Sequence, residues 1–278
     1  MITYSRKNLV KRLTNIRKRG QTIIAAGAGT GLSAKLIEQG GADLLLVFNS
    51  GRYRMDGHGS LSGLLAFGNA NDIALDMGER QVLPVVKEIP VICSVNGTDP
   101  TKCMEYHLGE VVRRGFSGVN NFPTVGLIDG NFRQQLEQTN LGYNKEVEIV
   151  ELAHKKDNFT IVYVFDTEEA KAMAKAGADA IVAHVGLTAG GTVGSKSALS
   201  MSESAALTRE IITAAKRYNA EALFLAHGGP LSTPKDLAEF LKLLPSIDGF
   251  VGASSMERLP TERAIVETVQ QFKKVAVQ

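Results

Sequence analysis

Two histidines in this sequence stand where a general acid or base is needed. His184 and His227 are each the last residue of a short apolar run, Ala180–His184 and Leu223–His227, of the kind that forms a buried strand. An imidazole at a strand end titrates near neutral pH and can give or accept a proton during a reaction. The same position suits a core histidine that makes only a structural hydrogen bond, and the pattern leaves both interpretations open.

Glycines and serines follow two of the apolar runs. Glycine lets backbone N–H groups approach an oxyanion closely, and the start of a helix adds a partial positive charge. A turn that only needs glycine for its shape is the alternative. We predict that an anionic group of a substrate binds at Gly228, Gly229, Gly252, Ala253, Ser254 and Ser255.

Polar side chains end two further runs. Asn49, Ser50 and Arg52 follow the run at residues 43–48, and Asn120 and Asn121 end the run that begins at Gly118. A guanidinium group binds a carboxylate or phosphate in bidentate geometry, and asparagine amides orient a substrate by neutral hydrogen bonds. We predict these five residues to bind substrate, although Arg52 is equally placed for a surface ion pair with Asp56.

Asp99 is the acidic residue that follows the run Val91–Val95. It is a candidate catalytic base and a candidate Mg²⁺ ligand. It is also placed to cap the helix predicted from Thr101. One carboxylate supplies little charge for a cation that loses water reluctantly, so we expect any Mg²⁺ to bind weakly, through Asp99 and water.

Eight apolar runs alternate with helical patterns and must position these side chains. The predicted strands are Thr22–Ala26, Asp43–Phe48, Val91–Val95, Gly118–Asn121, Phe159–Phe165, Ala180–His184, Leu223–His227 and Gly249–Gly252. The predicted helices include Ser33–Gln39, Thr101–Arg113, Lys145–Lys155, Glu168–Ala176, Ser202–Tyr218, Lys235–Leu243 and Thr261–Lys274. Continuous apolar strands are typical of parallel sheets covered by helices, and eight such units predict a single (β/α)8 barrel over residues 1–278.

Three further features refine this barrel. Residues 1–20 predict a basic amphipathic helix packed across the bottom of the barrel, with Leu9, Leu13 and Ile16 on its apolar face. Long segments at 49–71 and 122–143 follow strands 2 and 4 and are expected to be binding loops. Gly41-Ala42-Asp43 and Gly177-Ala178-Asp179 recur about half a chain apart, which favours a duplicated half-barrel.

Composition excludes several classes of protein. A formal charge of +2 gives no global field for nucleic acid or a membrane surface. Two cysteines, Cys93 and Cys103, predict neither a disulfide scaffold nor a zinc site, so we expect a reduced, cytoplasmic protein. The glycines of 27–31 have GxGxG spacing and not GxGxxG, so no nucleotide cofactor is expected.

Several long motifs together resemble one known family. They are residues 49–55 and 57–61, 115–130, Ala183-His184-Val185-Gly186-Leu187-Thr188, His227-Gly228-Gly229-Pro230 and residues 252–260. They resemble the phosphoenolpyruvate hydrolase-like TIM-barrel proteins, which occur alone in bacteria and as the C-terminal half of the tomato mosaic virus resistance protein. The resemblance implies a distant relation to the phosphoenolpyruvate mutase and isocitrate lyase superfamily, whose members bind 2-oxo acids through Mg²⁺. The acidic residues that this superfamily uses have no match here.

The sequence therefore predicts a barrel enzyme acting on a small phosphorylated or carboxylated metabolite. Phosphoenolpyruvate-type hydrolysis, or C–C bond chemistry on a 2-oxo acid, is the expected reaction. The alternative is a regulatory barrel that senses a metabolite without turning it over. We expect the partners to be a small anionic substrate and further copies of the chain in a homo-oligomer.

Overall fold

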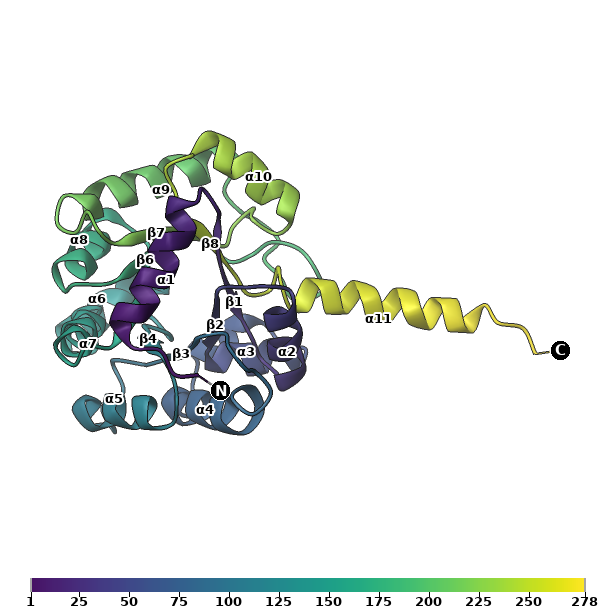
Figure 1. Ribbon diagram of the computed structural model, residues 1–278, viewed down its shortest axis with the longest axis horizontal. Coiled ribbons are helices and arrows are strands. Elements are labelled where there is room, and N and C mark those ends of the chain that lie inside the picture. The colour runs from purple at the N-terminus through teal and green to yellow at the C-terminus, as the bar shows by residue number, and fades with distance from the viewer. Residues whose placement is uncertain (1, 278) are drawn as a thin grey trace.

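Eight parallel strands close into a barrel in the computed structural model, which describes residues 2–277 (Figure 1). The strand order around the barrel follows the sequence, and β8 pairs with β1. The strands are β1 (Ile23–Gly27), β2 (Leu44–Val47), β3 (Val91–Ser94), β4 (Gly118–Asn120), β5 (Phe159–Val164), β6 (Ala180–His184), β7 (Leu223–His227) and β8 (Gly249–Gly252). The predicted (β/α)8 barrel is confirmed.

Helices surround this barrel on its outside. They are α1 (Arg6–Lys18), α2 (Gly31–Gln39), α3 (Asn49–Met55), α4 (Ala70–Met77), α5 (Met104–Arg113), α6 (Gly130–Gln138), α7 (Asn144–Lys155), α8 (Thr167–Lys175), α9 (Met201–Lys216), α10 (Pro234–Leu243) and α11 (Arg258–Lys273). Shorter helical turns are η1 (Ser60–Leu64), η2 (Gly78–Val82) and η3 (Val125–Leu127).

The two segments expected to be long loops contain regular structure. The segment after β2 holds α3 and η1, and the segment after β4 holds η3 and α6. Helix α3 lies against the loop after β1, where a Cβ atom on Gly29 would come within 2.1 Å of the Gly51 carbonyl oxygen. Glycine at 29 therefore permits a close backbone approach that fixes α3 at the mouth of the barrel.

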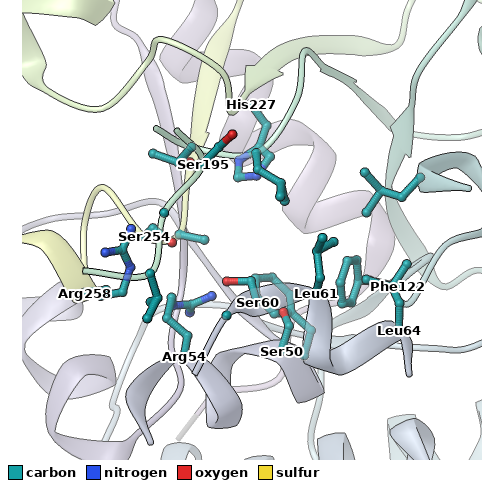
Figure 2. Close-up of a pocket in the computed structure, with 18 of the residues that line it drawn as sticks. Ser50, Arg54, Ser60, Leu61, Leu64, Phe122, Ser195, His227, Ser254 and Arg258 are labelled. Carbon is teal, nitrogen blue, oxygen red and sulfur yellow. The ribbon is translucent and has the colours of Figure 1, made fainter. Parts of the chain in front are cut away.

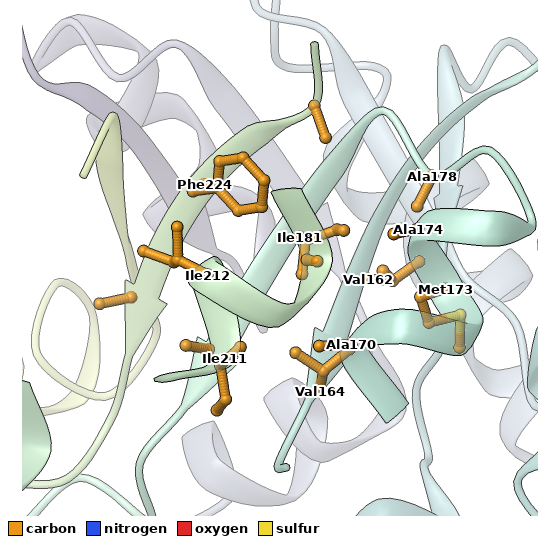
Figure 3. Close-up of a cluster of buried hydrophobic side chains, with 14 of the residues drawn as sticks. Val162, Val164, Ala170, Met173, Ala174, Ala178, Ile181, Ile211, Ile212 and Phe224 are labelled. Atoms are coloured by element: carbon orange, nitrogen blue, oxygen red, sulfur yellow. The ribbon is translucent and has the colours of Figure 1, made fainter. Parts of the chain in front are cut away.

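Alternate strand residues face the barrel interior and the helices. Ile161 and Tyr163 of β5 belong to the interior cluster, whereas Val162 and Val164 pack outward. Figure 3 shows the outward residues against Met173 of α8 and Ile211 of α9. This two-sided burial explains why the strands are continuously apolar in the sequence.

Helix α1 crosses one end of the barrel (Figure 1). Its Leu9, Leu13 and Ile16 are buried in the interior cluster with inward strand residues such as Ile23 and Phe159. The basic residues lie on its other face, and Arg6 pairs with Asp179 at 2.9 Å. The helix therefore closes the amino-terminal end of the barrel and leaves the opposite mouth for a site.

The repeated Gly-Ala-Asp motifs have one structural role. Asp43 precedes β2 and accepts a hydrogen bond from the Ile24 backbone N–H at 2.9 Å, and Asp179 precedes β6 and accepts one from Thr160 N–H at 3.0 Å. Asp248, before β8, accepts one from Phe224 N–H at 2.8 Å. Each carboxylate ties a strand to the preceding one at its start.

Helix α11 departs from the barrel wall and projects away from it (Figure 1). Of its residues, the structure buries only Arg258, while Ile265, Val269 and Phe272 are exposed. Within residues 2–277 no helix has the length and apolar character that a membrane span requires.

Candidate functional site

A cavity of about 180 Å³ opens at the carboxyl ends of the strands (Figure 2). Inward-facing aromatic residues from four strands line it: Phe48 after β2, Tyr163 of β5, His184 of β6 and His227 of β7. The β2 and β4 segments and the loops after β6 and β8 complete its walls. Barrel enzymes keep their active sites at this end, because loops there can vary without disturbing the packed interior.

His184 and His227 lie side by side, as their strand positions predict. The two residues are in register between β6 and β7, and their ring centroids are 4.6 Å apart. His184 Nδ1 accepts a hydrogen bond from the Gly186 N–H at 3.2 Å, so the proton of a neutral ring is on Nε2. His227 Nδ1 donates to the Val251 carbonyl oxygen at 2.7 Å, which leaves its Nε2 as an acceptor.

Both histidines are held neutral by their surroundings. Burial, together with the smaller effect of the Arg54 charge, lowers the pKa of His227 to about 4, although the Val251 hydrogen bond opposes this shift. Burial and the neighbouring His227 also lower the pKa of His184 well below its usual value. At neutral pH the cavity therefore has one imidazole donor and one imidazole acceptor, without a charge on either.

A buried ion pair forms one wall of the cavity. Arg54 donates from Nη2 and Nε to Glu257 Oε2 at 2.5 and 3.1 Å, and both side chains are almost completely buried. Glu257 Oε1 accepts from the Gly29 N–H at 2.6 Å and from the Ser33 hydroxyl group. The carboxylate has all its acceptor sites in use, so it fixes the guanidinium of Arg54 at the edge of the cavity.

A second arginine lies beside the first. Arg258, the first residue of α11, donates to Glu262 at 2.8 Å and to the Gly190 carbonyl oxygen at 3.0 Å. Glu262 also accepts from the Thr192 hydroxyl at 2.5 Å. These bonds tie the loop after β6 to the first turn of α11, and Thr188, Val193, Gly194 and Ser195 of that loop line the cavity.

Five residues predicted from the sequence line the cavity. They are His184, His227, Ser50, Ala253 and Ser254. Figure 2 places Ser254 near Arg54 and Arg258, and Ser50 beside Ser60. The turn at Ser254 precedes α11, whose first residue is Arg258.

Arg52 is on the outside of α3. Its side chain is 51% exposed and lies 4.0 Å from Asp56, the ion pair that the sequence offered as an alternative. Because residues 49–55 form a helix, Ser50 and Arg54, four positions apart, share the inward face, and Arg52 points away from it. Asn49 is buried but donates to the Gly63 carbonyl oxygen at 2.8 Å, so it holds η1 in place.

Gly228 and Gly229 form a turn and do not line the cavity of the described chain. Their φ angles are 85° and 56°, and a Cβ atom on Gly228 would come within 1.9 Å of the Gly186 carbonyl oxygen. The Gly229 N–H donates to that same oxygen at 2.9 Å. This amide is therefore already used within the protein, and the structure does not offer it to an anion.

The remaining predicted residues are buried near the cavity but outside its lining. Asn120 donates to the Ile161 carbonyl oxygen at 2.7 Å, and Asn121 bonds Glu146 and the Tyr163 backbone. Gly252 packs against Met256, and the Ser255 hydroxyl is buried. These residues support the strands that form the mouth.

Asp99 lies in a neighbouring hollow between the segments after β2 and β4. Its oxygens accept from Asn69 at 2.7 Å, Asn71 at 3.0 Å and the Thr101 N–H at 2.9 Å. Burial raises the pKa of Asp99, but these hydrogen bonds outweigh it and lower the pKa below the usual value. Asp99 therefore acts here as a structural acceptor that joins two loops.

Sequence reasoning missed Arg54 and Arg258, the two cations of the site. The sequence predicts a loop at residues 49–71, so only the family motif at 49–55 and the helical spacing from Ser50 point to Arg54. Arg258 follows β8 by six residues, so it is too far from the end of the strand for its position in the sequence alone to place it at the mouth of the barrel. Both arginines are recognised from three-dimensional proximity to Glu257 and Glu262.

The described residues do not fit a Mg²⁺ site. Within residues 2–277 no group of three histidine, cysteine or acidic side chains is placed to hold a metal ion. Glu257 is committed to Arg54, and Asp99 already accepts several hydrogen bonds. Because Mg²⁺ needs near-octahedral oxygen ligands, two arginines and two imidazoles form an unsuitable donor set.

Several solved structures have a fold similar to that of this chain. A 2,3-dimethylmalate lyase of the phosphoenolpyruvate mutase/isocitrate lyase superfamily matches with a TM-score of 0.64 and 16% identity, covering 100% of this chain and 90% of that one. A phosphonopyruvate hydrolase in complex with oxalate and Mg²⁺ matches with a TM-score of 0.56 and 17% identity, over 95% and 84% of the two chains. At this identity the likeness shows the fold.

Sequence relatives are more similar. The ToMV susceptible protein tm-1 of Solanum lycopersicum is 51% identical over 270 residues, 97% of this chain and 36% of the relative. A protein of Sinorhizobium fredii named "Putative transcriptional regulatory protein y4pA" is 35% identical over 258 residues, 93% of this chain and 42% of the relative. The chain thus spans about two fifths of the length of these relatives. The phosphoenolpyruvate hydrolase-like family model matches residues 8–275, which confirms the predicted resemblance, and the chain belongs to this family.

Proposed function

We propose that this barrel is an enzyme that binds a small carboxylated or phosphorylated metabolite at the cavity and moves a proton on it. The expected chemistry is hydrolysis of the phosphoenolpyruvate type or C–C bond chemistry on a 2-oxo acid. The observation that carries the proposal is the pair of neutral histidines with opposite hydrogen-bonding roles, next to Arg54 and Arg258. An acid and a base of fixed roles are what such reactions need.

We assign a proposed role to each group. His227 Nε2 takes a proton from the carbon next to the substrate carbonyl, and the electron pair of that C–H bond moves onto the carbonyl oxygen. His184 Nε2–H donates a hydrogen bond to this oxygen. Arg258 and Ser254 hold the anionic group, and Arg54 beside them adds a second cation to this side of the cavity. Bound negative charge raises the pKa of His227 from about 4, which makes the ring a stronger base when substrate is present.

The similar structures support an enzyme of this kind. Their names describe a lyase and a phosphonopyruvate hydrolase, both built on this fold. The hydrolase complex contains Mg²⁺, whereas the cavity of this chain is lined by histidines and arginines and has no carboxylate side chain among the described residues. We therefore propose proton transfer by side chains, without a metal-dependent step.

Proton exchange tests the proposal directly. The full chain is incubated in D₂O with pyruvate, 4-methyl-2-oxopentanoate and oxaloacetate, and loss of the C3 protons is followed by NMR. We expect enzyme-dependent exchange that falls by about 10²–10⁴-fold in His227→Gln, because a general base contributes that much. His58→Gln, at an exposed histidine, is the control. Exchange that is unaffected by His227→Gln would overturn the role of this residue.

A metabolite-sensing barrel is the second candidate function. The bacterial relative carries a regulatory name, and no carboxylate side chain lines the cavity among the described residues. Binding of an acid without exchange or product formation, in a screen that includes phosphoenolpyruvate, would favour this function over catalysis.

We also propose that the chain forms a homo-oligomer through α11. Ile265, Val269 and Phe272 recur at positions i, i+4 and i+7 and form an exposed apolar stripe. An apolar groove beside α2, lined by Leu32, Leu36 and other residues, offers a matching surface on a second copy. Phe272→Asp is expected to reduce the molar mass measured by light scattering, and an unchanged mass would contradict this arrangement.

The location that we propose is a reduced, cytoplasmic setting. The two cysteines, Cys93 and Cys103, are free, which is in keeping with it.

A further inference from the structure

The charges around the cavity balance one another. Arg54 is paired with Glu257 at 2.5 Å, and Arg258 with Glu262 at 2.8 Å. The two histidines are held neutral by burial. The site can therefore orient donors toward one anionic group, but it has little unbalanced positive charge. A phosphate monoester carries about 1.5 to 2 negative charges at neutral pH, which this site leaves largely uncompensated.

One backbone donor that would favour phosphate is already used within the protein. The Gly229 N–H bonds the Gly186 carbonyl oxygen at 2.9 Å, and the glycine turn does not line the cavity in the described residues. A planar carboxylate, in contrast, needs only two or three donors. Arg258, the Ser254 hydroxyl and the His184 Nε2–H are sufficient for one carboxylate and an adjacent carbonyl oxygen.

The opposite side of the cavity is apolar. Figure 2 shows Leu61, Leu64 and Phe122 across the opening from Arg54, Arg258 and Ser254. Leu127, Leu187 and Val193 are further apolar residues of the cavity lining. Phosphoenolpyruvate or a dicarboxylic acid would place a second charged group against these side chains, where it would lose hydration without gaining a partner.

The cavity is small. Its volume is about 180 Å³. This volume has room for a carboxylate, a carbonyl group and a short carbon chain.

We infer that the ligand is a short monocarboxylic 2-oxo acid with an apolar, branched chain, in place of a phosphorylated or dicarboxylic acid. This inference rests on the proposed function and names its substrate class. The carboxylate lies at Arg258 and Ser254, the carbonyl carbon faces His184 and His227, and the alkyl group packs on Leu61, Leu64 and Phe122.

Calorimetry on the full chain tests the substrate class with five probes. They are pyruvate, 3-methyl-2-oxobutanoate, 4-methyl-2-oxopentanoate, phosphoenolpyruvate and oxaloacetate. Each buried methylene group is expected to raise affinity about fourfold, so 4-methyl-2-oxopentanoate should bind on the order of fiftyfold more tightly than pyruvate. Tighter binding of phosphoenolpyruvate or oxaloacetate, or no binding of the branched acids, overturns the inference.

A matched pair of variants locates the alkyl group. Leu61 lines the cavity and Leu65 does not, although they lie four residues apart and are 45% and 61% exposed. Leu61→Asn should remove most of the difference between 4-methyl-2-oxopentanoate and pyruvate, and Leu65→Asn should preserve it. Equal effects of the two variants would overturn the placement of the chain.

Proton exchange separates this inference from the proposed function. Selective binding of the branched acids without C3 exchange would support the substrate class and contradict catalysis. Exchange on oxaloacetate that depends on His227, together with weak binding of the branched acids, would support catalysis and contradict the substrate class.

Discussion

The segments after β2 and β4 reach the same cavity but contribute different chemistry to it. The β2 segment (residues 49–71) gives the cavity Ser50, Arg54 and Ser60 in addition to two leucines. The β4 segment (residues 121–143) gives it only Phe122 and Leu127. The polar groups of the β4 segment, Asn121 and Arg133, are turned toward neighbouring elements of the barrel wall.

This difference shows which feature lets a long connection contribute polar side chains to the cavity. In the β2 segment a helix begins directly after the strand, so Ser50 and Arg54 on its successive turns face the mouth of the barrel. In the β4 segment Asn121 bonds the Tyr163 backbone, and α6 has no buried residue. We expect substitutions in the β2 segment to affect binding and stability together, and polar substitutions in the β4 segment to affect stability alone.

Arg54→Ala has the largest expected effect. It leaves Glu257 buried without its partner, so the free energy of unfolding should fall by about 3–5 kcal/mol and binding of 2-oxo acids should be lost. Urea denaturation and calorimetry measure the two effects. Arg52→Ala, two residues away on the exposed face of α3, is the matched control and should change stability by less than about 0.5 kcal/mol.

Arg54→Met combined with Glu257→Gln separates charge from packing. Because both charges are then removed, much of the lost stability should return while binding stays absent. Full binding in this double variant would show that Arg54 has only a structural role.

Asn121→Ala tests the β4 segment. Asn121 accepts from the Tyr163 N–H at 2.7 Å and donates to Glu146 at 2.7 Å, so its loss leaves buried groups unpaired. We expect the free energy of unfolding to fall by about 2–3 kcal/mol, with ligand affinity unchanged in the folded protein. A clear loss of affinity in calorimetry at low temperature would restore Asn121 to the substrate-binding residues predicted from the sequence.

The sequence predicted the fold because its signals are local. Each strand is a continuous apolar run, and His184 and His227 could be placed at the mouth because they end such runs. The site was harder to predict, because the role of each polar group depends on its hydrogen-bonding partner in the folded chain. The Gly229 N–H donates to the Gly186 carbonyl oxygen, and Arg54 faces the cavity in place of Arg52 because residues 49–55 form a helix. The local sequence pattern indicates neither of these facts.

Glu146, which accepts hydrogen bonds from the β4 segment, makes the free energy of unfolding depend on pH. Burial raises the pKa of Glu146 to about 8, against the lowering effect of hydrogen bonds from the Val125 N–H and Asn121. Between pH 4.5 and 8 the folded state therefore binds more protons at this residue than the unfolded state does. Its contribution to stability is present below pH 4.5 and is lost as pH rises to about 8, by at most about 1.4 kcal/mol per pH unit.

Glu146→Gln tests this contribution. The variant keeps a neutral side chain at all pH values, so the difference in unfolding free energy between wild type and variant should shrink from pH 5 to pH 8. Urea denaturation at several pH values measures it, with Glu148→Gln at a more exposed residue as the control. A constant difference would mean that Glu146 is ionised in the folded protein throughout this range.

Removal of divalent metal has the smallest expected effect. Asp99 was the metal ligand predicted from the sequence, but its oxygens hold Asn69 and Asn71 at the end of the β2 segment and Thr101 after β3. Mg²⁺ would have to displace these donors, and a cation present at its own Kd adds only about 0.4 kcal/mol of stability. Because any binding of Mg²⁺ is this weak, we expect EDTA, or millimolar Mg²⁺, to change the affinity for 2-oxo acids by less than about twofold.

Asp99→Asn tests the structural role of this residue. The variant should lower the free energy of unfolding by about 1–3 kcal/mol through its lost hydrogen bonds, with the same affinity for 2-oxo acids in the folded protein. If EDTA abolishes binding and Mg²⁺ restores it in wild type but not in Asp99→Asn, the loop after β3 is a metal site and the arginine-based account of the cavity is wrong.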